Sequence, residues 1–105
     1  MRSEERKGIK NLEEIKEKLQ KLRDLIKERY KAEVIGIFGS YVRGEQRKES
    51  DIDILVKFYK GATLFELVGL SLFLEEEIGI KVDVVPYDAV RKEIKEKVLN
   101  EVVCL

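Results

Sequence analysis

Apolar residues in the first third of the chain recur at alternating spacings of three and four. Between Asn11 and Tyr30 they form a single stripe, which predicts a long amphipathic helix. The stripe also fits a short coiled-coil seam, but it ends after fewer heptads than coiled coils usually have, so we expect this helix to pack on a core. Its members are Leu12, Ile15, Leu19, Leu22 and Ile26.

Three short runs rich in β-branched residues predict strands over residues 33–38, 51–58 and 80–85. The first strand breaks at Gly39 and Ser40, and a short helix is expected from Ser40 to Gly44. A polar loop over residues 45–49 leads to the second strand, and the third stops at Pro86.

Two further helices are predicted after the second strand. Thr63 is placed to cap a helix that reaches Ile78 and ends at Gly79, and Asp88 is a natural cap for a helix over residues 88–100. The helix after Thr63 has apolar residues in too many directions for one buried face. Either part of its surface, around Leu67 to Leu74, contacts another protein chain, or the helix is wedged between the sheet and its neighbours. The apolar residues are Leu64, Phe65, Leu67, Val68, Leu70, Leu72, Phe73 and Leu74.

The order helix, strand, strand, helix, strand, helix predicts an α/β (α+β) layer fold with a small mixed sheet of three to four strands and flanking helices. The second and third strands are joined by a helix, so we expect them to be parallel with a right-handed crossover. Residues 102–105 either add an edge strand or pack under the sheet. The 105 residues form one domain, 1–105, too short for a separate substrate-recognition domain.

Composition excludes several classes of chemistry. Lys plus Arg and Asp plus Glu balance at 21 each, so net charge does not favour a polynucleotide or an acidic membrane as partner. Cys104 is the single cysteine and histidine is absent, which excludes disulfide frameworks, Cys/His zinc sites and His-based catalytic triads. No apolar run approaches the length of about 20 residues that spans a bilayer, and the N-terminus is rich in Lys and Glu, so we expect a cytoplasmic protein.

The candidate chemistry lies where the first strand ends and the second begins. Backbone N–H groups and the hydroxyl at Gly39 and Ser40 can face a polyphosphate. Asp51 and Asp53 are two residues apart, so on a strand they project from one face about 6.6 Å apart along the chain. At an effective dielectric of about 20 they would repel by about 2–3 kcal/mol. Bound divalent cations would relieve that repulsion.

A third carboxylate, Asp83, stands among β-branched apolar residues on the third predicted strand. If the second and third strands are neighbours, Asp83 lies beside Asp51 and Asp53. Three hard oxygen ligands suit Mg²⁺ or Mn²⁺. Two ions about 3.5–4 Å apart could activate an attacking hydroxyl and stabilise a leaving pyrophosphate.

Structural alternatives exist for each part. Gly39 and Ser40 could form an ordinary strand-ending turn, and Asp83 could pair with Lys81, Lys57 or Arg43. Tyr41 could stack on a base or cover the turn. Four basic residues near the predicted site stay undecided between phosphate contacts and solvated positions: Arg47, Lys48, Arg91 and Lys92.

The combined pattern resembles the minimal nucleotidyltransferases of the DNA polymerase β-like superfamily. Four parts recur in the family's order on the expected elements, which makes the combination far more specific than a lone D-x-D. The resemblance covers essentially the whole chain and implies the polymerase β-like palm fold. The matching residues are Gly39-Ser40, Arg43-Gly44, Ser50-Asp51-Ile52-Asp53 and Asp83.

The resemblance implies roles for individual residues. Gly39 and Ser40 would bind the nucleoside triphosphate, and Asp51 and Asp53 would hold the metal ions. Asp83 would complete the catalytic metal site, with two Mg²⁺ expected and Mn²⁺ as the alternative ion, and would help to deprotonate the acceptor hydroxyl. Arg43 would contact a phosphate or form a structural ion pair with one of the aspartates.

Small members of this family that resemble the chain commonly act as antitoxins of type VII toxin–antitoxin pairs, whose toxin is a HEPN-domain ribonuclease. The resemblance therefore implies transfer of AMP from ATP to a tyrosine of such a toxin, which would itself supply the missing substrate domain. A second hypothesis is a catalytically silent antitoxin that neutralises the toxin by binding alone. A third, modification of a small molecule, would need oligomerisation to supply a substrate site. The acceptor, the base preference and the oligomeric state, including a homo-oligomer, stay open.

Overall fold

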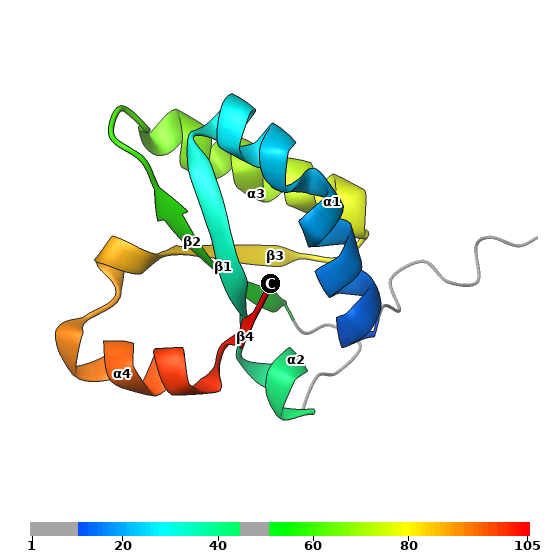
Figure 1. The fold of residues 1–105 in the computed structure, drawn as a ribbon, viewed down its shortest axis with the longest axis vertical. Coiled ribbons are helices and arrows are strands. Elements are labelled where there is room, and N and C mark those ends of the chain that lie inside the picture. Colours follow the sequence, from blue (N-terminus) through cyan, green and yellow to red (C-terminus); the bar gives the residue numbers. More distant parts are fainter. Residues whose placement is uncertain (1–10, 45–50) are drawn as a thin grey trace, which may run out of the picture.

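The computed structural model describes residues 11–44 and 51–105. Its centre is a four-stranded mixed sheet in the order β3-β2-β1-β4 (Figure 1). β1 (Ala32–Phe38) is antiparallel to both β2 (Ile52–Phe58) and β4 (Val103–Cys104), and β2 is parallel to β3 (Val82–Pro86). The mixed sheet and the parallel pair are confirmed, and the C-terminal residues form the edge strand rather than packing beneath the sheet.

Two long helices, α1 (Leu12–Tyr30) and α3 (Leu64–Ile78), lie together over one face of the sheet (Figure 1). The apolar stripe predicted for α1 faces the core, which favours core packing over a coiled coil. Between the helices and the sheet lies the main core, whose fully buried members include Ile15, Leu19, Ile26, Ile37, Ile52, Ile54, Leu70 and Leu74.

Local signals fix the ends of both long helices. The side chain of Asn11 accepts a hydrogen bond from the Glu14 N–H at the start of α1. Thr63 and Glu66 form a reciprocal capping box at the start of α3, and Gly79 ends α3 in the left-handed region, with φ 89°. The predicted boundaries of these helices are therefore correct to within one residue.

One side of α3 is packed against the sheet, as one interpretation of this helix predicted, and the other side is exposed, as the interpretation of a protein contact requires. Leu70, Leu74 and Ile78 are buried against the sheet, and Leu67 and Phe73 pack at the edge of the core. The opposite side leaves four large apolar side chains in solvent, at fractional exposures of 69%, 87%, 50% and 61%. We call these the α3 apolar face: Leu64, Phe65, Val68 and Leu72.

The last helix begins later than predicted. Tyr87–Ala89 forms a separate turn of 3₁₀ helix, Val90 and Arg91 are extended, and α4 runs from Lys92 to Glu101. Asp88 is therefore not the cap of α4, and its N-cap residue, Arg91, makes no side-chain capping bond. The interruption has a local cause, because the Val90 N–H closes a turn on the Tyr87 carbonyl and thereby ends the 3₁₀ segment. β3 also begins at Val82 rather than at Ile80 and includes Pro86.

Gly36 of β1 allows the edge strand β4 to pack closely against β1. A Cβ atom on Gly36 would collide with the backbone carbonyl of Val103, so only glycine lets β4 approach β1 this closely. A β-bulge between Val34 and Gly36 shifts the register of β1 just before this contact. Neither of the long helices nor any other helix among the described residues is long and apolar enough to cross a membrane.

Candidate active site

The turn after β1 is built around a glycine. Gly39 has φ 89° and ψ −154°, a conformation that residues with a Cβ rarely adopt, and it precedes the short helix α2 (Ser40–Arg43). A Cβ atom there would also collide with the Oδ2 atom of Asp53. Gly39 is thus required twice, once for the backbone turn and once to let the Asp53 carboxylate lie against it.

The sheet register places two predicted site residues side by side. Asp53 of β2 is paired with Phe38 of β1 on one side and with Asp83 of the parallel strand β3 on the other. Neighbouring strands are about 4.8 Å apart, so the two carboxylates are direct neighbours. Because side chains alternate along a strand, both point away from the face that α1 and α3 cover. Asp83 is exposed, whereas Asp53 is half-buried.

This neighbourhood makes Asp53 difficult to ionise. Its pKa is raised from 3.8 to about 6, first by burial and then by the charge of Asp83, a hydrogen bond with Asp83 and the charge of Asp51. The positive charge of Arg43 acts in the opposite direction. A cation bound between these carboxylates would offset the repulsion among them and favour the ionised form of Asp53.

The carboxylates fit a divalent metal that is shared with a substrate. Mg²⁺ is commonly held by one or two carboxylates together with phosphate oxygens of the substrate, and the adjacent Asp53 and Asp83 offer such a pair. Asp51 is exposed, close enough to affect the pKa of Asp53. Within residues 11–44 and 51–105, no group of three or more Asp, Glu, Cys or His side chains has the spacing of a preformed metal site. The metal site accordingly stays a prediction.

Arg43 ties α2 to the last helix. Its guanidinium forms a salt bridge of 2.5 Å with Glu101, at the end of α4. The sequence suggested an aspartate or a phosphate as its partner, and nothing local indicated a carboxylate 58 positions away. About half of the Arg43 side chain is exposed, so its outer surface is accessible to a ligand near the turn.

Other residues singled out in the sequence fall in different places. Tyr41 is buried in the main core, so it covers the turn and is not available to stack on a base. Lys92 is exposed at the start of α4, whereas Arg91 lines a pocket beside the carboxylates. Arg47, Lys48, Ser50 and the predicted polar loop over 45–49 lie outside the described residues.

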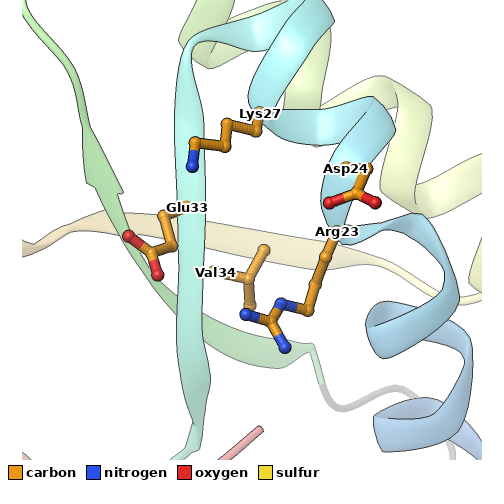
Figure 2. A pocket seen from close by; sticks show the side chains of 5 residues that line it. All are labelled: Arg23, Asp24, Lys27, Glu33 and Val34. Atoms are coloured by element: carbon orange, nitrogen blue, oxygen red, sulfur yellow. The ribbon is translucent and has the colours of Figure 1, made fainter.

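Residues of α4 line two hollows, and one of them also contains the carboxylates. A shallow hollow of about 560 Å³ lies between α2 and α4, and the residues that line it are all polar or charged: Arg43, Lys97, Asn100 and Glu101. A mainly apolar pocket of about 360 Å³ opens beside Asp53 and Asp83, between β3 and α4. By contrast, the hollow between α1 and β1 in Figure 2 is only about 50 Å³, too small for a nucleotide, and is lined by Arg23, Asp24, Lys27, Glu33 and Val34.

Comparison with known families gives one match over nearly the whole chain. The nucleotidyltransferase domain model matches residues 5–105. That range contains the Gly39 turn, the paired aspartates and both hollows.

Individual relatives agree with this match. The chain is 42% identical over 93 residues to a Methanocaldococcus jannaschii protein provisionally named as a protein adenylyltransferase, covering 89% of this chain and 95% of that protein. It is 41% identical over 92 residues to the protein adenylyltransferase MntA of Thermococcus cleftensis, covering 88% and 93%.

Solved structures share the fold. A provisionally assigned minimal nucleotidyltransferase superposes with a TM-score of 0.78 at 35% identity, over 91% of this chain and 97% of that one. A chain solved in a toxin–antitoxin complex with AMP-PNP superposes with a TM-score of 0.66 at 24% identity, over 84% of this chain and 69% of that one.

Proposed function

The chain belongs to the nucleotidyltransferase domain family and is a nucleotidyltransferase, and from this premise we propose that it transfers AMP from ATP to a hydroxyl group of a partner protein. The observation that carries the proposal is the side-by-side pair Asp53 and Asp83 next to the Gly39 turn. Relatives named as protein adenylyltransferases support a protein acceptor. A fold neighbour solved with AMP-PNP supports ATP as the donor.

The chain's own residues divide the work between donor and acceptor. Gly39 and Ser40 bind the triphosphate, because a turn without a Cβ lets phosphate oxygens approach the backbone. Arg43, which is paired with Glu101 and about half exposed, adds a positive charge beside the phosphates. Asp51, Asp53 and Asp83 hold Mg²⁺, with Mn²⁺ as the alternative. When bound, the metal neutralises the phosphates and lowers the pKa of an acceptor hydroxyl.

The partner we propose is a HEPN-type ribonuclease toxin, with a tyrosine as the acceptor. Fold neighbours solved as toxin–antitoxin complexes support a toxin partner. The α3 apolar face supports a protein contact, because four large apolar side chains in one stripe cost free energy while they stay in water. It is separate from the carboxylates, so a partner bound there keeps the catalytic end of the sheet accessible.

The test combines the protein with the HEPN toxin, ATP and Mg²⁺ and measures the intact mass of the toxin. We expect a gain of one or more AMP units that maps to tyrosine. The Asp51→Asn variant should give none, whereas Asp88→Asn, an exposed carboxylate outside the site, should give the wild-type gain. An unmodified toxin with the wild-type protein would contradict the proposal.

The α3 apolar face also favours a second candidate, neutralisation by binding alone. In that case Asp51→Asn would still neutralise the toxin, and Val68→Glu on the exposed side of α3 would not. Under the enzymatic proposal, Asp51→Asn fails to neutralise although it still binds. Toxin activity and complex formation, measured on the same two variants, separate the candidates.

A further inference from the structure

The apolar walls of the pocket beside the carboxylates are formed by residues of β3 and α4 that are not part of the predicted catalytic motif. Val85 of β3 and Ile94 and Val98 of α4 supply apolar walls, and Val90 lies on the segment between them. Asp53 and Asp83 stand at one side of the pocket, and its volume of about 360 Å³ is within the usual range for ligand sites, about 300–1,000 Å³.

The pocket beside β3 and the hollow between α2 and α4 differ in the charge of the side chains that line them. Arg43 and Lys97 give the hollow beside α2 two cationic side chains against one carboxylate, Glu101, and Arg43 belongs to the short helix that follows the turn at Gly39. The pocket on the β3 side has Arg91 as its one cationic lining residue among those described, and the Arg91 side chain is 76% exposed. Polyphosphate therefore suits the α2 side, and an apolar group suits the β3 side.

The geometry of phosphoryl chemistry assigns the two sides to different reactants. In an in-line displacement the attacking and leaving oxygens lie on opposite sides of the phosphorus atom. If the β- and γ-phosphates lie along the α2 side, the attacking hydroxyl must come from the β3 side. That is the side on which the apolar pocket opens.

We propose that the pocket lined by Val85, Val90, Ile94 and Val98 receives the side chain of the acceptor and selects an aromatic hydroxyl. This inference rests on the proposed AMP transfer to a protein. The ring lies against the apolar walls, and its hydroxyl points to the Asp53 and Asp83 end. An acceptor serine would be too short to fill the pocket and would leave its apolar walls in water, so it gains less from binding there.

The transfer step is balanced within these reactants. The phenolic oxygen forms a bond to the α-phosphorus of ATP, and the bond from that phosphorus to the oxygen bridging to the β-phosphorus breaks. Pyrophosphate leaves, and the phenolic proton passes to solvent. The products are a tyrosine-linked AMP and pyrophosphate.

The first arm of the test fills the pocket. Ile94→Trp places a large side chain at the wall, and Leu99→Trp is the matched control, because Ile94 and Leu99 lie on the same helix at 44% and 42% exposure and Leu99 does not line the pocket. We expect Ile94→Trp to lower the rate of AMP transfer to the toxin by about tenfold or more, while the Kd for Mg²⁺-AMP-PNP, measured by calorimetry, changes less than about twofold. Leu99→Trp should change neither.

Unchanged transfer in Ile94→Trp overturns the proposal. An equal loss of nucleotide affinity also overturns it, because the pocket would then hold the base of the nucleotide.

The second arm needs no catalysis and separates this inference from the proposed function. Methyl-labelled protein saturated with Mg²⁺-AMP-PNP is titrated with N-acetyl-tyrosinamide and, in parallel, with N-acetyl-serinamide. We expect the tyrosine amide to shift the methyl signals of Val90, Ile94 and Val98, and the serine amide to leave them in place. If the wild-type protein modifies no toxin but these shifts occur, the proposed function fails and the pocket assignment stands. Absent or equal shifts overturn the assignment even if AMP transfer is observed.

Discussion

The face of the sheet beneath α1 and α3 is lined by apolar side chains, whereas the end of the sheet at the Gly39 turn carries carboxylates side by side. No polar or charged residue is fully buried in the described part of the chain, and the main core consists mostly of leucine, isoleucine and valine. At the other region, Asp53 has a pKa raised to about 6 by burial and by its acidic neighbours. The first region stabilises the fold. The second keeps like charges together at a cost in stability, which is typical of a site that becomes neutral only with its ligand.

The variant Asp53→Asn should affect catalysis and stability most differently. This change removes a proposed metal ligand but also a like charge, so AMP transfer should fall by about 10²–10³-fold or more while the free energy of unfolding at pH 7 stays equal or rises. Transfer rate and chemical unfolding are measured on the same preparation. A variant that loses transfer because it unfolds would contradict the division between the regions.

The reverse behaviour is expected from Leu74→Ala in the core. Leu74 is fully buried under α3, so truncating it should lower the free energy of unfolding by about 2–5 kcal/mol. Leu72→Ala, two residues away on the same helix and 61% exposed, should change it by less than about 0.5 kcal/mol. Urea unfolding measures both. At temperatures where Leu74→Ala is folded, its transfer rate should be that of the wild type.

Gly39→Ala tests the contact between the regions. An alanine at φ 89° is strained, and its Cβ would displace the Asp53 carboxylate, so we expect a loss of about 1–3 kcal/mol in stability together with loss of nucleotide binding. Gly44→Ala is the control, since Gly44 also has a positive φ, 74°, but has open space around its Cβ position. It should show the strain without the loss of binding. Equal binding losses in both variants would argue that backbone strain alone, not the Asp53 contact, is responsible.

The smallest expected effect is a pH dependence of stability that originates at Asp53. Its pKa is raised in the folded state, so the folded protein binds more protons than the unfolded chain between about pH 4 and pH 6. The stabilising contribution is therefore complete below pH 3.8 and is lost as the pH rises through about 6. Because the carboxylate is partly exposed, we expect the free energy of unfolding to change by only about 1–2 kcal/mol over this pH range. The difference in unfolding free energy between wild type and Asp53→Asn, measured without metal across this range, isolates the contribution. A difference independent of pH would contradict it.

The sequence predicted most of the fold because its signals are local. The stripe of α1 and the caps at Thr63 and Gly79 act within one or two turns of helix, so their boundaries are nearly correct. The predicted start of α4 was wrong because Asp88, although a residue typical of helix caps, lies inside the 3₁₀ turn Tyr87–Ala89.

The site was predicted only in part because half of its contacts are distant in sequence. The neighbouring positions of Asp53 and Asp83 followed from expecting parallel strands, and the structure confirms that pairing. The salt bridge from Arg43 to Glu101 and the apolar pocket beside α4 depend on how the last helix packs against the sheet, which no local pattern reveals. The available signal was the spacing of four between Val90, Ile94 and Val98, and it also fits an ordinary amphipathic helix.

The central claim is that the like charges at the end of the sheet are kept for a metal-bound nucleotide. Thermal unfolding of the wild-type protein and of Asp53→Asn at pH 7, each with and without Mg²⁺-AMP-PNP, tests it most directly. With ligand at about 100 times its Kd, the account predicts about 2.7 kcal/mol of added stability for the wild type and little for the variant. An equal increase in the unfolding temperature of both proteins, or no increase in either, would contradict the claim.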